Sequence, residues 1–152
     1  MPGRAGRPIG RVPAFWDTSA LVPLCVHQGT TPNAIALYKL HSVVVWWTTS
    51  VEIASALARL LRMKQISPAD CAKARKLANV LSDSWSVIQP SDALRTKALR
   101  LVERYDLRAA DSLQLAAALE WCEGVPQGRV LLTADERLRQ AAILNGFDAQ
   151  LV

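Results

Sequence analysis

The chain has 152 residues, of which 51% are hydrophobic and 20% are charged, and its net charge is +5. This length indicates one domain. The apolar content excludes an intrinsically disordered chain, and because no stretch approaches ~18 consecutive apolar residues, we expect no transmembrane helix. A basic charge balance is typical of proteins that contact a polyanion.

The cysteine pattern points to a reducing compartment. Cys25, Cys71 and Cys122 are odd in number, lie far apart and form no CxxC pair. They fit reduced thiols in a cytosolic protein better than a disulfide framework or a zinc site. The basic N-terminus is not followed by an apolar core of roughly 7–15 residues, so it does not resemble a secretory signal. We therefore expect a cytoplasmic location.

Residues 1–12 differ in composition from the rest of the chain. They are rich in Gly and Pro and contain Arg4, Arg7 and Arg11, with no acidic residue among them. We predict that they form a flexible basic leader, followed by a single domain over residues 13–152. An arm that contacts the phosphates of a nucleic acid is the alternative interpretation of the same residues.

The hydrophobic pattern after the leader predicts strands that alternate with helices. In chain order we expect a strand at 14–16, helices at 19–27 and 32–41, a strand at 43–48, helices at 50–64 and 68–81, a strand at 85–88, helices at 91–105 and 109–122, a strand at 129–133, a helix at 135–144 and a strand at 147–152. Such an alternation implies right-handed crossovers, and therefore an α/β fold whose parallel sheet carries helices on both faces.

Four acidic residues follow strands or begin helices of this pattern. Asp17 follows the first strand, Glu52 lies in the first turn of the helix after the second strand, and Asp135 follows the fourth strand. Asp111 begins a helix that is apolar nearly all round. Because ligands of open parallel sheets bind outside the carboxyl ends of the strands, we expect these four carboxylates to lie at one edge.

Each acid also has a purely structural interpretation. Residues 49–52 and 133–136 both fit capping boxes, with a Glu at the third helical position, and Asp17 fits an N-cap. Asp111 is the hardest to explain in this way, because an Asp within a buried apolar helix is costly unless it is paired or bound to a metal.

Taken together, the four acids favour a divalent cation. Carboxylates gathered at one edge repel each other, and oxygen ligands suit Mg²⁺ or Mn²⁺. His27 and His41 are not near the acids in sequence, and we interpret them as surface or helix-end residues. Carboxylate-bound metal ions are typical of enzymes that hydrolyse phosphodiesters. The remainder of the chain stays basic, as expected of an enzyme that binds a polyanion.

The motifs that carry these acids resemble those of PIN-domain endoribonucleases of the VapC type, which are toxins of bacterial type II toxin–antitoxin pairs. The matching motifs are DTSAL at 17–21, TTSVE at 48–52, LRAADSLQLAAAL at 107–119 and LLTAD at 131–135. They occur in the family's order and span nearly the whole domain. The longer leader and the bulky Trp46-Trp47 pair depart from the family's pattern, and neither involves the four acids.

This resemblance implies a three-layer αβα fold with strand order 3-2-1-4-5 and a Mg²⁺-dependent endoribonuclease. It further implies that Asp17 and Asp111 bind the metal directly, and that Glu52 and Asp135 act through water or orient the attacking water. The residues that match small hydroxyl positions, and would hold the acids or a phosphate oxygen, are Ser19 and Thr133. The implied products are a 5′-phosphate and a 3′-hydroxyl.

The resemblance also implies a cognate antitoxin and a homodimer with one antitoxin per subunit. Arg108, one turn before Asp111, is a candidate for binding a substrate phosphate, although a solvated helix-end Arg is an equal alternative. Apolar residues of the first helices are candidates for an antitoxin groove, or equally for the core: Leu21, Leu24, Leu37 and Leu40.

Two other classes of protein remain as alternatives. A non-catalytic PIN module, or a housekeeping RNA-processing nuclease, would share the fold. A phosphoacceptor receiver domain or a nucleotide-binding protein would also be doubly wound. However, the chain has neither the paired acids after the first strand that a receiver needs nor a GxGxxG motif.

Overall fold

Five parallel strands form a single sheet in the computed structural model, which describes residues 10–152. The strand order is β3-β2-β1-β4-β5. The strands are β1 (Val12–Trp16), β2 (His41–Trp46), β3 (Ser86–Ile88), β4 (Val130–Thr133) and β5 (Asp148–Leu151). The predicted α/β class and the order implied by the resemblance are therefore confirmed.

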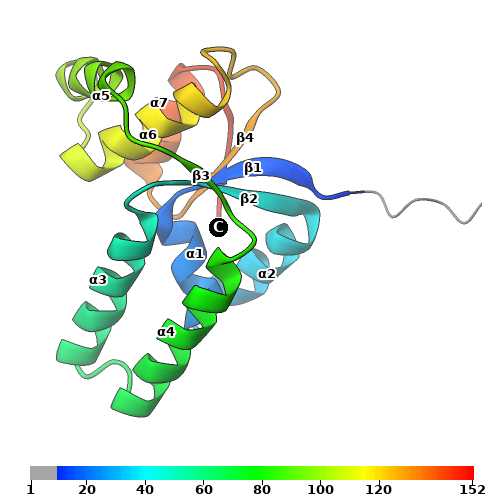
Figure 1. The fold of residues 1–152 in the computed structure, drawn as a ribbon, viewed down its shortest axis with the longest axis vertical. Coiled ribbons are helices and arrows are strands. Elements are labelled where there is room, and N and C mark those ends of the chain that lie inside the picture. Colours follow the sequence, from blue (N-terminus) through cyan, green and yellow to red (C-terminus); the bar gives the residue numbers. More distant parts are fainter. Residues whose placement is uncertain (1–9) are drawn as a thin grey trace, which may run out of the picture.

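Helices cover both faces of the sheet (Figure 1). One layer, below the sheet in that view, contains α1 (Thr18–Cys25), α2 (Thr31–Leu40), α3 (Thr49–Arg62) and α4 (Pro68–Ser82). The other layer contains α5 (Asp92–Arg104), α6 (Ala109–Trp121) and α7 (Glu136–Leu144). Since each crossover carries at least one helix, every pair of neighbouring strands in the sheet is parallel.

Alternating residues of the central strands supply two separate cores. Phe15, Val44 and Leu131 point to the side of α5, α6 and α7, where they are buried with Leu115 and the alanines of α6. Trp16 and its neighbours on the opposite face pack with α1, α3 and α4. Because strands that are buried on both faces read as continuous apolar runs, this arrangement explains the apolar pattern of β2.

The second strand lies earlier in the chain than the sequence pattern indicated. It was expected at 43–48 and runs from His41 to Trp46. His41, which we assigned to the preceding helix, pairs with Val12 of β1. At the other end, the chain leaves the sheet after Trp46, since Thr48 is the N-cap of α3.

The described chain begins at residue 10, just before β1. Arg11 donates a hydrogen bond to the Tyr38 carbonyl (3.0 Å) and lies over the Tyr38 ring at 4.8 Å. Arg4 and Arg7 of the predicted leader lie outside the described residues, and the prediction of a flexible leader stays a prediction.

The sequence left four leucines of the first two helices open between an antitoxin groove and the core. Leu21 is fully buried and is a core residue rather than part of a groove, whereas Leu40 is 62% exposed. Leu24 and Leu37 are half-buried against the core of the α1–α4 side.

All three cysteines are buried and free, and burial raises the pKa of Cys25 to about 11. Burial also raises the pKa of Cys122, so the Cys25 and Cys122 thiols are not activated as thiolates.

Candidate active site

Asp17 is the buried centre of the carboxylate group. It follows β1 directly, and its backbone N–H donates to the Leu132 carbonyl of β4 (2.9 Å), which fixes it at the carboxyl edge of the sheet. Its Oδ2 accepts hydrogen bonds from the hydroxyls of Ser19 and Thr133. Its Oδ1 accepts none from residues 10–152. The side chain is therefore held from one side, with one oxygen free for a ligand.

Ser19 and Thr133 form part of a small hydroxyl network. Their hydroxyl oxygens lie 3.2 Å apart. The backbone N–H of Ala134 donates to Ser19 Oγ (2.8 Å), and that of Asp135 donates to Thr133 Oγ1 (3.0 Å). Because each hydroxyl accepts from the backbone of the β4–α7 loop, its own proton is directed at Asp17.

Glu52 is held by side chains from three elements. Its Oε1 accepts from the Thr48 hydroxyl (2.6 Å), and its Oε2 accepts from the Thr18 hydroxyl (2.7 Å) and Gln114 Nε2 (3.0 Å). The structural alternative for Glu52, a capping box that starts at Thr49, does not form, because the N-cap is Thr48 and its side chain makes no capping bond. Glu52 thus bonds to the hydroxyl of its own N-cap residue and to two side chains across the site, Thr18 and Gln114.

Asp111 and Asp135 complete the edge from the other layer. Asp111 is half-buried in the first turn of α6, and Asp135 is the N-cap of α7, where its Oδ1 accepts from the Leu138 N–H (2.9 Å). The alternative capping box that starts at Thr133 therefore does not form, since Asp135 itself caps α7. This role uses one oxygen and leaves Oδ2 free of hydrogen bonds with residues 10–152.

The pKa shifts of Asp17 and Asp111 show that the four carboxylates interact electrostatically. Burial, the largest cause, and the charges of Asp111 and Glu52 together raise the pKa of Asp17 to about 6, against the opposing hydrogen bonds from Ser19 and Thr133. Burial also raises the pKa of Asp111, as do the charges of Asp135 and Glu52, while the Arg108 guanidinium opposes this rise. The structure thus gathers carboxylates whose ionised forms need a compensating cation.

The donor set fits a hydrated Mg²⁺ or Mn²⁺ ion better than a fully protein-enclosed metal. Within residues 10–152, no group of three or more His, Cys, Asp or Glu side chains lies close enough to enclose a metal ion. Mg²⁺ usually takes one or two carboxylates and keeps several waters. Asp17, with its free Oδ1, and Asp111 fit such direct ligands. Glu52, whose two oxygens already accept hydrogen bonds, fits a contact through water.

The remaining residues that the sequence analysis considered are Arg108 and the two histidines. Arg108 is the exposed N-cap of α6. His27 is exposed, and His41 lies at the start of β2, where its Nδ1 is 3.1 Å from the Val12 carbonyl oxygen. This is the opposite edge of the sheet from the acids, so neither histidine belongs to the site.

Our sequence reasoning missed three polar residues that position Glu52: Thr18, Thr48 and Gln114. Gln114 is 1% exposed, and its Nε2 also reaches the Thr18 hydroxyl (3.1 Å). The available signal was its spacing, because Gln114 follows Asp111 by three residues and therefore lies on the same helical face. A polar side chain inside an otherwise apolar helix segment needs a polar partner.

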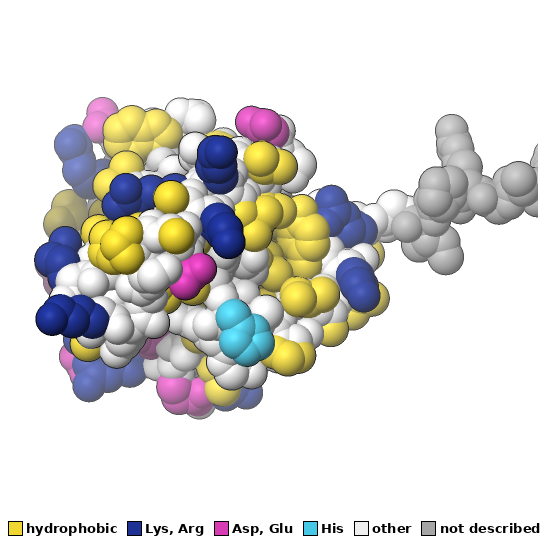
Figure 2. Space-filling view, turned by 90° about the horizontal axis from the view of Figure 1, so that it is seen from below, with side chains coloured by type: hydrophobic (Ala, Val, Ile, Leu, Met, Phe, Trp, Pro, Cys, Tyr) yellow, Lys and Arg dark blue, Asp and Glu magenta, His cyan; other side chains and the backbone are white. Residues whose placement is uncertain are grey.

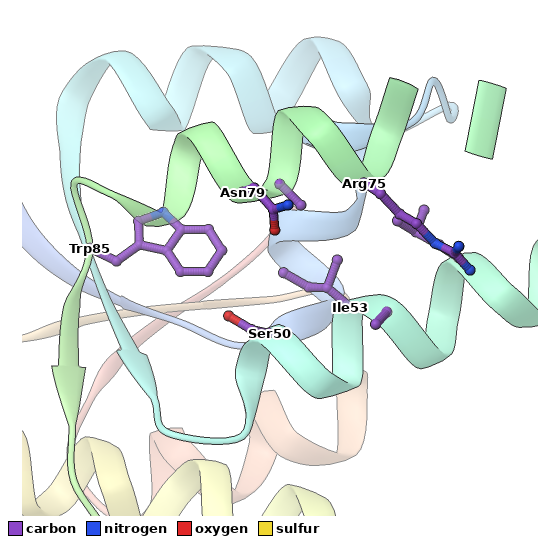
Figure 3. Close-up of a pocket in the computed structure, with 8 residues that line it drawn as sticks. Ser50, Ile53, Arg75, Asn79 and Trp85 are labelled. Carbon is purple, nitrogen blue, oxygen red and sulfur yellow. The ribbon is translucent and has the colours of Figure 1, made fainter. Parts of the chain in front are cut away.

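A separate cavity of about 190 Å³ lies between α3 and α4. Figure 3 shows Ile53 on its floor, the Trp85 ring at one end and the Arg75 guanidinium at the other, with Ser50 and Asn79 at its sides. None of the four acids lines it. The cavity is therefore a feature of the helical arm formed by α3 and α4 and not of the carboxylate site.

Comparison with family models decides the family. The PIN domain model matches residues 14–144, which includes all four acids and nearly the whole described fold. This chain belongs to the PIN-domain family. PIN domains are generally nucleases, and the family therefore supports a hydrolase that acts on nucleic acid.

Several solved structures share this PIN fold. PAE2754 from Pyrobaculum aerophilum has a TM-score of 0.65 at 21% identity, covering 93% of this chain and 90% of that one. FitAcB from Neisseria gonorrhoeae has a TM-score of 0.61 at 14% identity, covering 89% and 96%. A toxin–antitoxin complex from Klebsiella pneumoniae has a TM-score of 0.58 at 16% identity, covering 80% and 86%. At these identities the likeness establishes the fold.

A search of the curated proteins found no match to this chain. None of the helices within residues 10–152 combines the length and the hydrophobicity that a membrane span requires.

Proposed function

We propose that this PIN domain is a Mg²⁺- or Mn²⁺-dependent endoribonuclease that acts as the toxin of a toxin–antitoxin pair. The observation that carries the proposal is the group of four carboxylates at the carboxyl edge of the sheet, with the buried Asp17 at its centre. The printed descriptions of similar structures, which include a toxin–antitoxin complex and VapBC2 from Rickettsia felis bound to a DNA fragment from its promoter, support the biological role.

In this proposal Asp17 and Asp111 hold the metal, which when bound supplies a polarised water and a positive charge beside the phosphate. Ser19 and Thr133 fix Asp17 through Oδ2, so that Oδ1 stays available. The hydrogen bonds to Glu52 hold that carboxylate in place at the rim.

Asp135 and Glu52 would orient the attacking water. Asp135 has Oδ2 available to accept its proton, because only Oδ1 caps α7. In-line attack forms a new bond from the water oxygen to phosphorus and breaks the bond from phosphorus to the 3′ oxygen. The leaving oxygen takes up a proton, which yields a 3′-hydroxyl and a 5′-phosphate.

Basic side chains around the acids would hold the RNA backbone. Arg108 is exposed one turn before Asp111, where it can bind a phosphate next to the metal. The arm of α3 and α4 carries six exposed cations against one acid between residues 59 and 76, and Figure 2 shows Lys and Arg side chains spread over the face that this arm contributes to. A polyanion would be attracted to both regions.

The proposed partner is an antitoxin, and the proposed assembly is a homodimer with one antitoxin per subunit. The cavity between α3 and α4 has an apolar floor and Arg75 at one end (Figure 3). These features suit an antitoxin helix that has an apolar face and carries an acidic residue. A further basic residue of the antitoxin would pair with the carboxylates and displace the metal. The buried thiols suit a cytoplasmic location.

The direct test is cleavage of end-labelled single-stranded RNA by the purified chain. We expect cleavage with Mg²⁺ or Mn²⁺, none with EDTA, and none for Asp111→Asn, while the exposed Asp83→Asn serves as the matched control. Cleavage that persists in EDTA or in the Asp111 variant would contradict the proposal. Absence of cleavage by the folded wild type would favour a non-catalytic PIN module.

Expression in a bacterial host tests the toxin role. We expect the wild-type chain to slow growth and the product of an adjacent upstream gene to relieve this effect. If the wild-type chain is abundant and cleaves RNA but does not slow growth, the result would point instead to a housekeeping RNA-processing nuclease.

A further inference from the structure

Trp47 is an exposed aromatic residue held in a fixed position beside the carboxylate site. Its side chain is 56% exposed, yet its backbone N–H donates to the Ile88 carbonyl at the end of β3 (3.1 Å). Its ring meets that of the buried Trp46 edge to face, with centroids 6.5 Å apart. Because these contacts restrain the backbone and one edge of the ring, the entropy cost of ordering Trp47 when a ligand stacks on it is small.

The position of Trp47 relative to the acids follows from the chain. The next residue, Thr48, donates its hydroxyl proton to Glu52 Oε1 (2.6 Å). Trp47 is therefore one residue away from a group that holds the rim of the proposed active site. Trp47 follows β2 directly, and β2 lies between β1, which precedes Asp17, and β3 (Figure 1). An RNA strand that runs from the acids toward β3 along this edge would cross the end of β2.

A cavity of about 490 Å³ opens next to the Trp46 ring. It lies between the β3–α5 loop and α6, and its lining includes Trp46, Arg95 and Leu113, the last of which follows Asp111 by two residues. Its volume is within the roughly 300–1,000 Å³ of ordinary ligand sites. None of the four acids lines the cavity, and Trp47 adjoins it through the edge-to-face contact with Trp46.

The polar groups of this cavity suit the edge of a nucleobase. Trp46 is 4% exposed, and its indole N–H has no hydrogen-bond partner within residues 10–152. This N–H is enclosed by protein atoms, so the polar groups that an incoming base can reach are those at the rim. At the rim, Arg95 and Asp92 pair at 2.8 Å and are highly exposed, so they offer donors and an acceptor to an incoming base.

We propose that Trp47 and the adjoining cavity form a binding site for one unpaired nucleobase of single-stranded RNA, immediately beside the scissile phosphate. This inference rests on the proposed function for the identity of the strand. RNA is the favoured occupant, since Arg95 offers hydrogen-bond donors at the rim of the cavity while a base can stack on the exposed Trp47 ring. Stacking on aromatic residues is how proteins hold single-stranded bases.

The test measures binding in EDTA, where no metal-dependent cleavage occurs, with short single-stranded RNAs in which one position at a time is abasic. We expect Trp47→Ala to weaken binding of the intact RNA by about 5-fold or more, because a stacked base contributes roughly 1–3 kcal/mol. Binding of the RNA that is abasic at the matching position should hardly change. Trp47→Phe should restore most of the affinity, and RNA should quench tryptophan fluorescence less in Trp47→Ala than in the wild type.

The matched control is Leu40→Ala, which removes another exposed large apolar side chain, 62% exposed, at the opposite edge of the sheet. Equal affinity of wild type and Trp47→Ala for intact RNA overturns the proposal. An equal loss on intact RNA and on every abasic RNA also overturns it. Circular dichroism and thermal melts of Trp47→Phe establish that the fold is retained.

The outcomes also separate this site from the proposed function. Trp47-dependent binding of a base without any cleavage in Mg²⁺ supports the base site and refutes the nuclease. Cleavage in Mg²⁺ with unchanged RNA binding by Trp47→Ala supports the nuclease and refutes the base site.

Discussion

Replacing Asp17 with asparagine removes the buried charge at the centre of the site while keeping the shape of the side chain. Asparagine Oδ1 can still accept the protons of Ser19 and Thr133 that now reach Asp17 Oδ2. The charge that a metal requires is absent. We therefore expect Asp17→Asn to lose cleavage and to stabilise the metal-free protein at neutral pH.

The size of this stabilisation follows from the pKa of Asp17. Burial raises that pKa from 3.8 to about 6, so the folded protein binds the proton more tightly than the unfolded chain. Stability in EDTA therefore falls as pH rises between about 4 and 6, and above that range the ionised carboxylate costs up to about 3 kcal/mol. Asp17 is 4% exposed, so solvent does little to reduce this cost.

The assay is thermal and urea unfolding in EDTA from pH 3.5 to pH 8. At pH 7.5 we expect Asp17→Asn to unfold up to about 10 °C above the wild type, given about 2–4 °C per kcal/mol for a chain of this size. The two proteins should converge near pH 4. Added Mg²⁺ should raise the midpoint of the wild type and not that of the variant.

Asp83→Asn, which changes an exposed carboxylate at the end of α4, is the matched control and should be close to neutral. The reasoning is refuted if Asp17→Asn is less stable than the wild type at pH 7.5 in EDTA. It is also refuted if the difference between the two proteins does not depend on pH.

Three further predictions concern the metal, Glu52 and the last turn of the fold. Mg²⁺ or Mn²⁺ at 100 times its dissociation constant should stabilise the protein by about 2.7 kcal/mol, and EDTA should leave it folded; melts that superimpose in all three conditions would speak against a metal site. Gln114→Leu removes a hydrogen-bond donor to Glu52, together with a buried Oε1 that has no partner within residues 10–152. We therefore expect the cleavage rate to drop roughly tenfold while the free energy of unfolding changes by less than about 1 kcal/mol. A wild-type cleavage rate would contradict the positioning role of Gln114. Gly146→Ala places a Cβ 2.9 Å from Gln127 Nε2 on a backbone with a φ of +105°, and it should lower the free energy of unfolding in urea by about 1–3 kcal/mol. The control is Gly29→Ala, whose Cβ meets nothing within 4 Å. Equal urea midpoints for the two variants would contradict this prediction.

The positions of the four acids were predictable because they depend on local pattern and on one general rule of topology. Apolar runs predict the strands, and parallel strands bring their carboxyl ends to one edge. Asp17 and Asp135 follow strands in the sequence itself, so their meeting required only that the sheet be parallel with β1 beside β4. The strand order came from the motifs and not from the periodicity.

The contacts that make these acids a site were decided by the tertiary structure. Gln114 reaches Glu52 across 62 residues and Thr18 across 96, and Thr133 reaches Asp17 across 116. No local pattern encodes such pairs. For the same reason the sequence left the capping boxes open as alternatives, because a hydroxyl or carboxylate at the start of a helix can bond to partners that only the folded chain brings within reach.

Burial was likewise determined by packing. Leu21 and Leu40 look alike in the sequence, but one is fully buried and the other is 62% exposed, because α1 packs against α3 and α4 while α2 ends at the surface. The same holds for Trp46 and Trp47, where the end of β2 separates a buried ring from an exposed one. The sequence by itself determined which residues are apolar and which are charged. The depth at which the sheet buries Asp17, and hence its raised pKa, exists only in the assembled fold.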